Sequence, residues 1–540
     1  MSARVFDAVV IGGGHNGLVC AAYLAAKGRS VCVVERRDVV GGAAVTEEFH
    51  PGFRNSTASY TVSLLDPQVI ADLNLARHGL RIVERPFANF LPLPGDAYLK
   101  VGGGLAATQT ELALHSVRDA ERLPAYYAML DRVADVLRLL LRQTPPNIRG
   151  GGRRDLGAML AAWKLTRGFR SMSLAERRDL LDLFTKSAGD VLDRWFESTA
   201  IKAAFGFDSV VGNFASPYAP GSAYVLLHHV FGEVNGKRGQ WGHAIGGMGA
   251  ITQAMAQECG ARGVEVRLGI GVERVIVERG RAAGVALANG EIVGAKRVVA
   301  NVNPRLLFER LVPPEHVDAD FRTRIAGYKC GSGTFRMNVA LTELPDFRAL
   351  PGRNAQPHHS SGIIVAPSLD YMERAYFDAR TDGWSKAPIV EVLIPSTVDS
   401  TLAPAGQHVA SLFCQHVNPD IGSVKPGTTW DDHRERVADL MIDTVDRVAP
   451  NFKASVLGRR ALTPLDLERE FGLIGGDIFH GALSLDQLFS ARPVLGNADY
   501  RMPVKGLYLC GSGAHPGGGV TGLPGRNAAR EILKDMRHSR

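Results

Sequence analysis

A glycine-rich segment near the start of the chain holds the residues with the clearest chemistry. Gly12, Gly14 and Gly17 have the spacing G-x-G-x-x-G and follow an apolar run at 6–11 that is rich in β-branched residues. Glycines at these positions permit a tight turn, let the backbone approach a pyrophosphate and let a helix pack closely on a strand. Free N–H groups and the dipole at the start of that helix attract phosphate. The segment therefore predicts a dinucleotide-binding turn.

The residues around these glycines predict the strand–helix–strand unit that such a turn needs. We expect a helix at 18–26 and a second strand at 30–34, which Glu35 follows. A carboxylate at the end of the second strand can accept hydrogen bonds from the ribose hydroxyls of an adenosine. The complete order of strand, glycines, helix, strand and acid is more specific than the glycine motif alone.

The residues after Glu35 favour FAD over NAD as the dinucleotide. A basic pair at 36–37 leads to a second loop with Gly41 and Gly42, where bare backbone N–H groups can approach phosphate again. A nicotinamide-dependent dehydrogenase would instead continue with another βα unit. The pattern is typical of flavoproteins of the glutathione-reductase-like superfamily.

A second glycine-rich segment, at 246–249, opens a helix and precedes a series of short strands over 264–300. Within these strands the pair Asn289-Gly290 predicts a type I′ hairpin. In this superfamily such a strand series returns to the nucleotide domain, and a backbone at a position like Val272 meets the adenine. Alone, the glycines at 246–249 are equally compatible with an ordinary loop.

A third segment has the same order of strand, glycine-rich loop and helix as the first. A strand at 507–510 opens into a glycine-rich loop over 511–519, before a helix at 523–536. Bare backbone and a helix N-terminus can hold the ribityl chain and the pyrimidine end of a flavin. The residues that we expect to bind FAD are Gly12, Gly14, Asn16, Gly17, Glu35, Arg36, Gly41, Gly42, Ala43, Val272, Gly511, Ser512, Gly519 and Val520.

Five stretches match the pattern of a known family: GGGHNGL at 12–18, ERRDVVGGAAVTEE at 35–48, GGMGAI at 246–251, GDIFHGALSLDQLF at 476–489 and CGSGAHPGGGVTGLPGRNAA at 510–529. On these motifs the chain resembles, over essentially its whole length, the phytoene-desaturase-related FAD oxidoreductases. Within them it is most similar to a branch named after a pyridine nucleotide-disulphide oxidoreductase domain. The resemblance implies an FAD oxidoreductase with carotenoid desaturases and ketolases among its better-understood relatives.

The resemblance also implies a location. The animal member of the branch is similar to mitochondrial proteins at the matrix side of the inner membrane, with a suggested role in mitochondrial function. In this chain the first strand begins by Phe6, which leaves no room for an arginine-rich presequence. Together with a composition rich in alanine, glycine and arginine, this predicts a bacterial, cytoplasmic member.

The cysteines do not fit the name of that branch. The chain has six cysteines, and none forms a CxxC or CxxxxC pair. The glycines at 331–333 do not make a second dinucleotide motif, because position 336 is arginine. We therefore expect no disulphide reduction, no metal site and a reducing compartment.

Composition narrows the classes of partner. The 540 residues are 45% hydrophobic and 22% charged, which is typical of globular proteins. The net charge of +7 is spread along the chain instead of being gathered into a stripe with aromatic residues, so nucleic-acid binding is not expected. A denser arginine stretch at 149–178 and apolar helix faces at 137–141 and 159–165 could contact an anionic membrane surface peripherally. A solvated basic surface and packed core faces are the alternatives.

Together these observations predict an α/β fold in which a Rossmann-like FAD-binding domain is interleaved with an α+β substrate domain. The FAD-binding domain is expected at 1–65, 240–304 and 496–540, and the substrate domain at 66–239 and 305–495. In the substrate domain, helices are expected at 121–143, 156–166, 174–186, 198–205 and 429–448, and strands at 388–394 and 409–416.

Hydride transfer to a flavin needs little covalent help from the protein, beyond placing a C–H bond, excluding water and removing a proton. The catalytic candidates near the flavin ring are His480, Asp486 and His515; the alternative is that the histidines are structural hydrogen-bonding groups. We expect an FAD-dependent dehydrogenase or desaturase for a small or lipophilic organic substrate, with oxygen or a quinone as acceptor. The alternative is a flavin-bearing interaction or regulatory protein with a docking surface and little turnover.

Overall fold

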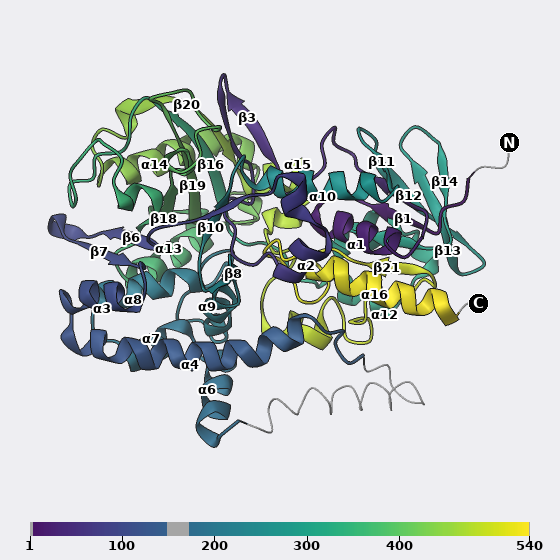
Figure 1. The fold of residues 1–540 in the computed structure, drawn as a ribbon, viewed down its shortest axis with the longest axis horizontal. Coiled ribbons are helices and arrows are strands. Elements are labelled where there is room, and N and C mark those ends of the chain that lie inside the picture. Colours follow the sequence, from purple (N-terminus) through teal and green to yellow (C-terminus); the bar gives the residue numbers. More distant parts are fainter. Residues whose placement is uncertain (1–3, 148–171, 539–540) are drawn as a thin grey trace.

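The computed structural model describes residues 4–147 and 172–538. A five-stranded parallel sheet, in the order β11–β2–β1–β15–β21, lies in the half of the molecule that holds both termini (Figure 1). Its strands are β1 (Ala8–Ile11), β2 (Val31–Val34), β11 (Glu265–Arg267), β15 (Val298–Ala300) and β21 (Leu507–Leu509). The sheet therefore joins the first, middle and last parts of the chain, as the α/β prediction requires.

Helices cover this sheet and bury its central strands. Every residue of β1 and β2 is buried, as expected for a parallel strand with both faces covered. Helix α1 (His15–Ala25) packs against α10 (Met248–Ala261) and α16 (Leu523–His538), and all three contribute to one apolar core with the sheet. The same core contains Val69 and Phe321, from stretches that the sequence assigns to the substrate domain.

The hairpin predicted at Asn289-Gly290 is present, but its turn is not type I′. It joins β13 (Arg281–Leu287) to β14 (Ile292–Gly294) in a small antiparallel sheet with β12 (Val272–Glu278). Gly290 has φ of +86° and donates its N–H to the Leu287 carbonyl at 2.9 Å, whereas Asn289 does not have positive φ. A three-residue loop that ends in a left-handed glycine has this geometry, and a type I′ turn would need positive φ at both central residues.

A second, seven-stranded sheet occupies the other half, in the order β20–β16–β19–β18–β17–β6–β7. Alternate residues of β16 face opposite sides: Phe335 and Met337 pack in one core with α14 (Arg434–Asp446), whereas Arg336 reaches the carbonyl of Ala58 on the other side. The strands are β6 (Asn89–Pro92), β7 (Tyr98–Val101), β16 (Phe335–Leu341), β17 (Gly362–Val365), β18 (Trp384–Leu393), β19 (His408–Val417) and β20 (Val456–Leu462).

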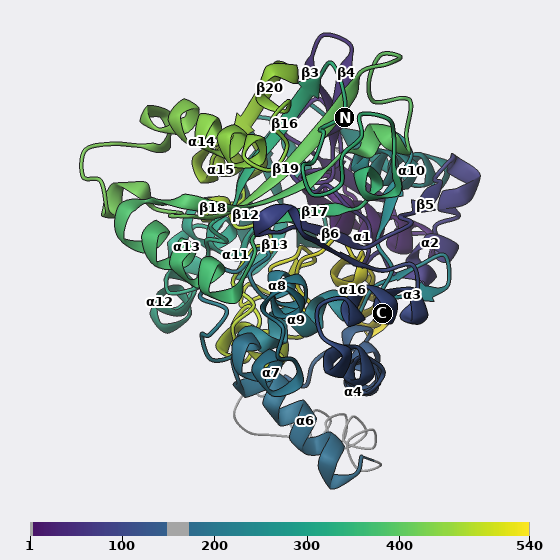
Figure 2. The same ribbon diagram turned by 90° about the vertical axis from the view of Figure 1, so that its left-hand side faces the viewer.

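A helical layer covers the face of this sheet opposite α14, with α8 and α9 nearest to it (Figure 2). Its helices are α3 (Leu105–Ala113), α4 (Val117–Leu141), α6 (Leu174–Thr185), α7 (Ala188–Trp195), α8 (Thr199–Gly206) and α9 (Ser222–Val230). The helices predicted at 121–143, 174–186 and 198–205 are confirmed. The helix predicted at 156–166, the apolar face at 159–165 and most of the arginine stretch at 149–178 lie outside the described residues.

Shorter elements connect these layers. They are α2 (Pro67–Asp72), α11 (Pro304–Leu306), α12 (Ala319–Ala326), α13 (Leu369–Asp382), α15 (Pro464–Phe471), β3 (Thr46–His50), β4 (Phe53–Ser56), β5 (Ile82–Glu84), β8 (Glu233–Val234), β9 (Lys237–Arg238) and β10 (Gly242–Ala244). No helix within residues 4–147 and 172–538 has both the length and the apolar character of a membrane span.

The core of the parallel sheet makes the fold sensitive to a truncation in α1. Leu18 is fully buried there, so Leu18→Ala should lower the free energy of unfolding by about 2–5 kcal/mol. The matched variant Leu114→Ala, at a position that is 75% exposed, should change it by less than about 0.5 kcal/mol. Chemical denaturation followed by circular dichroism checks both values; equal losses would contradict this account of the core.

Candidate functional site

A cavity opens where the first two glycine-rich loops meet, at the carboxyl ends of β1 and β2. The structure brings together in its lining many of the residues that the sequence assigned to FAD: Gly12, Gly14, Glu35, Arg36, Gly41, Gly42, Ala43, Val272 and Ser512. The cavity also has a wall that sequence reasoning missed, the end of α15 at 470–472. An elongated site at this edge of a parallel sheet is the usual position for a dinucleotide.

The glycines of the first loop are required by close packing around Asn301. A Cβ atom at Gly14 would lie 2.9 Å from Asn301 Nδ2, and one at Gly511 would lie 3.1 Å from Asn301 Oδ1. A Cβ at Gly17 would lie 2.3 Å from the Gly12 carbonyl oxygen, which accepts a hydrogen bond from Asn301 Nδ2 at 3.1 Å. Sequence reasoning missed Asn301, although its position directly after the predicted strand at 297–300 could have revealed it.

The second glycine loop lies directly on the first. Gly41 donates its N–H to the Gly13 carbonyl at 2.9 Å, and Gly41 and Gly14 form a parallel bridge. Gly41 has φ of +130°, and a Cβ there would lie 2.6 Å from the Ala44 carbonyl oxygen. A side chain is therefore excluded at Gly41 both by backbone conformation and by space.

Glu35 holds the first loop and remains available to a ligand. Its carboxylate is buried and accepts hydrogen bonds from the N–H groups of Gly13 at 2.7 Å and Arg37 at 3.0 Å. A carboxylate has about four acceptor sites, so both oxygens can still accept from ribose hydroxyls. Arg36 instead donates to the carbonyls of Arg469 and Glu470 at the end of α15, and so it holds a wall of the cavity.

The third segment meets the start of α1. Asn16 Nδ2 donates to Ser512 Oγ at 3.1 Å, while Asn16 Oδ1 and His15 Nε2 are buried without a hydrogen-bond partner in the described protein. No side chain of the described residues caps the N-terminus of α1 at Gly14. Buried polar atoms of this kind need partners, and free N–H groups at a helix start suit phosphate. The residues present therefore fit an anionic dinucleotide.

Gly519 and Val520 lie away from this cavity. Gly519 has φ of +101°, and a Cβ there would lie 2.5 Å from Leu64 Cδ1 and 3.5 Å from His228 Nε2. Val520 also has positive φ, at +57°, which is strained for a β-branched residue. That both contact FAD stays a prediction.

The glycines at 246–249 have a packing role in this structure. Cβ atoms at Gly247 and Gly249 would lie 2.4 Å from Thr46 Oγ1 and 2.6 Å from Thr46 N. They let the start of α10 approach β3, and none of the four residues lines the cavity. At these glycines the structure therefore shows close packing of two elements, whereas the strand series that follows them reaches the cavity at Val272.

His480 lines the cavity as a neutral base. It has φ of +57°, and its Nδ1 atom is buried without a partner among the described residues. Burial, and secondarily the charge of Arg492, lowers the pKa of His480 to about 4. Burial and the neighbouring His480 lower the pKa of His15 to about 3. Both imidazoles are neutral near pH 7.

His515 makes a structural hydrogen bond, which was the alternative to a catalytic role. It is buried, and its Nε2 pairs with the Leu140 carbonyl at 3.0 Å; burial lowers its pKa to about 4, so the neutral ring donates there. Asn527 donates to the Leu141 carbonyl at 3.0 Å and Arg530 to the Arg142 carbonyl at 3.3 Å. These three side chains satisfy the free carbonyls at the end of α4. His515 is therefore a positioning residue.

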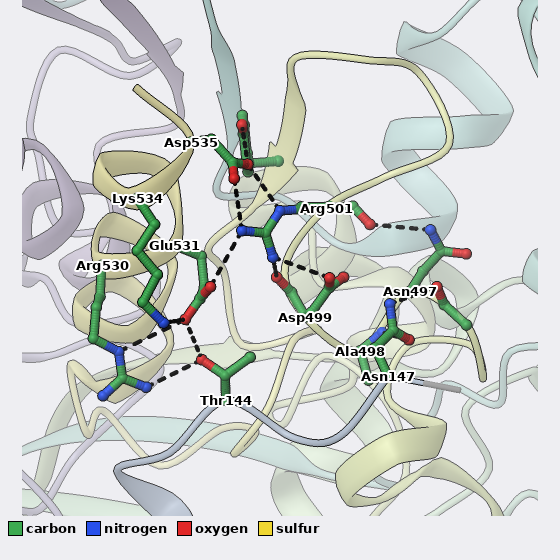
Figure 3. Close-up of polar contacts among 12 residues, drawn as sticks. Thr144, Asn147, Asn497, Ala498, Asp499, Arg501, Arg530, Glu531, Lys534 and Asp535 are labelled. Atoms are coloured by element: carbon green, nitrogen blue, oxygen red, sulfur yellow. Dashed lines mark hydrogen bonds and ion pairs between the residues drawn. The ribbon is translucent and has the colours of Figure 1, made fainter. Parts of the chain in front are cut away.

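Further contacts fix the same region (Figure 3). Arg501 forms ion pairs with Asp499, Glu531 and Asp535, and Glu531 accepts a hydrogen bond from Thr144 at 2.7 Å. The segment after α4 is thus tied to α16.

Asp486 does not belong to the cavity. Its side chain is 57% exposed and forms an ion pair with Lys329 at 2.7 Å. The short 3-10 turn that carries it turns the carboxylate outward, so we assign it no catalytic role. This corrects the expectation from its place in the FHGALSLDQ run.

Two cysteines that are far apart in the sequence meet in the fold, which spacing could not reveal. Cys20 of α1 and Cys510 after β21 interact through their thiols, and both are fully buried. Burial raises the pKa of the Cys510 thiol well above its ordinary value. A disulphide reductase needs an accessible thiolate, which this pair does not provide.

Comparison with known proteins agrees with the geometry. The family model described as flavin containing amine oxidoreductase matches residues 17–334. The chain is 42% identical to pyridine nucleotide-disulfide oxidoreductase domain-containing protein 2 of Rattus norvegicus, over 99% of this chain and 94% of the relative. It is 25% identical to one of the polypeptides of limonene dehydrogenase from Castellaniella defragrans, over 98% and 95%. It is 24% identical to the lycopene-forming phytoene desaturase of Pseudescherichia vulneris, over 95% and 96%. The predicted resemblance is confirmed.

Among solved structures, putrescine oxidase bound to putrescine superposes with a TM-score of 0.60 at 16% identity, and 99% of each chain is covered. At this identity the likeness concerns the fold alone.

The packing at Asn301 predicts that Gly14→Val abolishes flavin binding. The added side chain would meet Asn301 Nδ2 and fill the space in which a pyrophosphate approaches the backbone. The measurement is the ratio of flavin to protein absorbance after purification. The control Gly260→Val changes a helix glycine whose added Cβ would have no neighbour within 4 Å, and it should retain full flavin. Stoichiometric flavin in Gly14→Val would refute the site.

Proposed function

The chain belongs to the family of flavin-containing amine oxidoreductases, and from this premise we propose that it is a dehydrogenase or desaturase for a lipophilic organic substrate. It is an FAD-dependent oxidoreductase, and FAD is its cofactor. We propose oxygen or a quinone as the acceptor that reoxidises the flavin.

The cofactor would supply the redox chemistry, and the protein would bind and orient it. When bound, FAD accepts a hydride from a substrate C–H bond. The two stacked glycine loops and the start of α1 would hold its pyrophosphate, and Glu35 its adenosine ribose. The third segment, through Ser512, would hold the part of the cofactor that lies toward the substrate.

One observation carries the proposed reaction: a neutral histidine in the cofactor cavity whose ring nitrogen Nδ1 is buried and unpaired among the described residues. Loss of hydride from one carbon and of a proton from the neighbouring atom leaves a double bond in the substrate. His480 Nδ1 is buried without a partner in the described protein, so it can accept that proton. Burial of this part of the site also excludes water.

An apolar cavity supports a lipophilic substrate. It measures about 720 Å³, within the usual range for small-molecule sites, and lies between α4, α6 and the turn at His515 and Pro516. Its walls include Leu140, Leu180 and Phe184, and Leu181 at its edge is 60% exposed. We propose that this edge contacts a lipid surface peripherally. Limonene and phytoene, for which two of the relatives are named, are hydrocarbons, which agrees with this substrate class.

Anaerobic reduction of the bound flavin tests the proposal. Purified holoenzyme is mixed with a panel of lipids and metabolites, and bleaching of the flavin spectrum is followed. At least one lipophilic compound should reduce the flavin, and oxygen or a quinone should restore its colour. If no compound reduces it and no acceptor reoxidises chemically reduced protein, the flavin-bearing interaction protein is the better description.

The state of His480 predicts a pH profile. Because burial holds its pKa at about 4, the base is neutral above that pH, so the rate of flavin reduction should be level from pH 6 to 8. It should fall as the pH approaches 4, where the ring gains a proton. His480→Gln should lower the rate by about 10²–10⁴-fold with FAD retained. The control His316→Gln alters an exposed ring and should behave as the native protein. Unchanged kinetics in His480→Gln would exclude the base.

A further inference from the structure

A polar cluster interrupts the apolar face of the seven-stranded sheet that the helical layer covers. Tyr60 donates its hydroxyl to Glu391 Oε2 at 2.6 Å. The Tyr60 ring stacks on Phe413, with ring centroids 5.2 Å apart, and the guanidinium carbon of Arg336 lies 4.5 Å from the Tyr60 ring centroid. These contacts and the hydrogen bond hold the tyrosine in place. We call this group the Arg85 cluster; it consists of Arg85, Tyr60, Arg336 and Glu391.

The Arg85 cluster lies beside the cofactor loops. Ser59, next to Tyr60, donates its N–H to the carbonyl of Ala43 at 2.9 Å, and Ala43 lines the FAD cavity. Four residues further along, Leu64 packs against Gly519 of the third glycine segment. The stretch 57–64 thus runs from the loop that contains Gly41 and Gly42 to the glycine-rich segment that contains Gly519, and Tyr60 lies between these two contacts.

The two arginines of the cluster differ in how their donors are used. Arg336 is fully buried and donates to the carbonyls of Ala58 and Leu412 and to Ser411 Oγ, at 2.6–3.0 Å. The guanidinium of Arg85 donates to Thr61 Oγ, and no carboxylate of the described residues lies within ion-pair distance of it. Arg336 is therefore a framework group, whereas Arg85 has donors to offer.

The charges of the cluster do not cancel. Two guanidinium groups face one carboxylate, that of Glu391. Burial raises the pKa of Glu391, although the charges of Arg85 and Arg336 act to lower it. Asp208 faces Glu391, and burial, with the Glu391 charge, raises the pKa of Asp208 to about 7. With two guanidinium groups and one carboxylate, the Arg85 cluster carries net positive charge. Arg85 is partly exposed and has no ion pair of its own among the described residues, which favours an anionic ligand.

The four residues of the cluster differ in exposure. The Oε1 atom of Glu391 packs against Gly362, where an added Cβ atom would lie 2.8 Å from it. Glu391 and Arg336 are buried, whereas Tyr60 and Arg85 each retain part of their exposed surface. A ligand can therefore reach Arg85 and Tyr60 but not the two buried groups.

We propose that Arg85 binds a carboxylate of the substrate, so that the substrate class is a lipophilic carboxylic acid. This rests on the proposed function and specifies its substrate. The planar fork of an arginine matches a carboxylate with two parallel hydrogen bonds. A positive cluster repels a protonated amine, and a plain hydrocarbon would leave the Arg85 donors unpaired.

Three ten-carbon probes test the inference on holoenzyme: decanoate, decanol and decylamine. Their affinities are read from the perturbation or bleaching of the flavin spectrum under anaerobic conditions, which does not require turnover. Decanoate should bind at least about tenfold more tightly than the other two. Equal binding of the three, tighter binding of decylamine or no binding of any probe would overturn the inference.

Variants locate the preference. Arg85→Leu should abolish the preference for decanoate, and Arg85→Lys should keep part of it because the charge remains without the fork. Arg324→Leu, at an exposed arginine paired with Asp320, is the matched control and should bind as the native protein. An unchanged preference in Arg85→Leu would overturn the assignment, and the native protein decides if that variant does not fold. A protein that prefers decanoate but is reduced by no compound would fail the proposed function instead.

Discussion

The cofactor site depends on the close packing of backbone around one side chain, that of Asn301. Its amide bonds the first glycine loop at Gly12 and lies where Cβ atoms at Gly14, Gly17 and Gly511 would be. Loops from both ends of the chain can therefore meet at the carboxyl end of the central strand pair. The glycines are needed less for flexibility than for contact distance, since most of their added Cβ atoms would meet backbone or amide atoms at about 3 Å or less. The first loop, held in this way, positions the second loop, Glu35 and the start of α1.

Contacts at the end of α4 join the helical layer to the last part of the chain. The free carbonyls of α4 are satisfied by His515, Asn527 and Arg530, which belong to the last part of the chain. The ion pairs of Arg501 then join α16 to the loop before it, and Thr144 adds the segment after α4. A helix of the helical layer is thus completed by side chains from the last part of the chain. This explains why His515 is buried and neutral.

The site combines two electrostatic environments. Around the cofactor cavity, burial keeps His15 and His480 uncharged, which suits the removal of hydride and proton from an apolar substrate. On the sheet face, the two guanidinium groups of Arg85 and Arg336 face the single carboxylate of Glu391, which suits the anionic end that we propose for the substrate. Such a division places recognition at one end of a ligand and chemistry at the other, so that binding energy can orient the reacting bond.

The dinucleotide fold, the cofactor and the family could be predicted from the sequence, because glycine spacing, an acid after the second strand and buried β-branched runs are local patterns with direct physical causes. It also predicted α4, α6, α8 and α14, but it missed others, among them α3, α7, α9, α12 and α13. Which side chains meet depends on the tertiary structure. Asn301 carries no motif, Asp486 is turned outward by its short helical turn, and the glycines at 246–249 serve the packing of α10 on β3. The Cys20–Cys510 contact and the Arg85 cluster join residues hundreds of positions apart. Such contacts depend on the path of the whole chain, which local spacing does not encode.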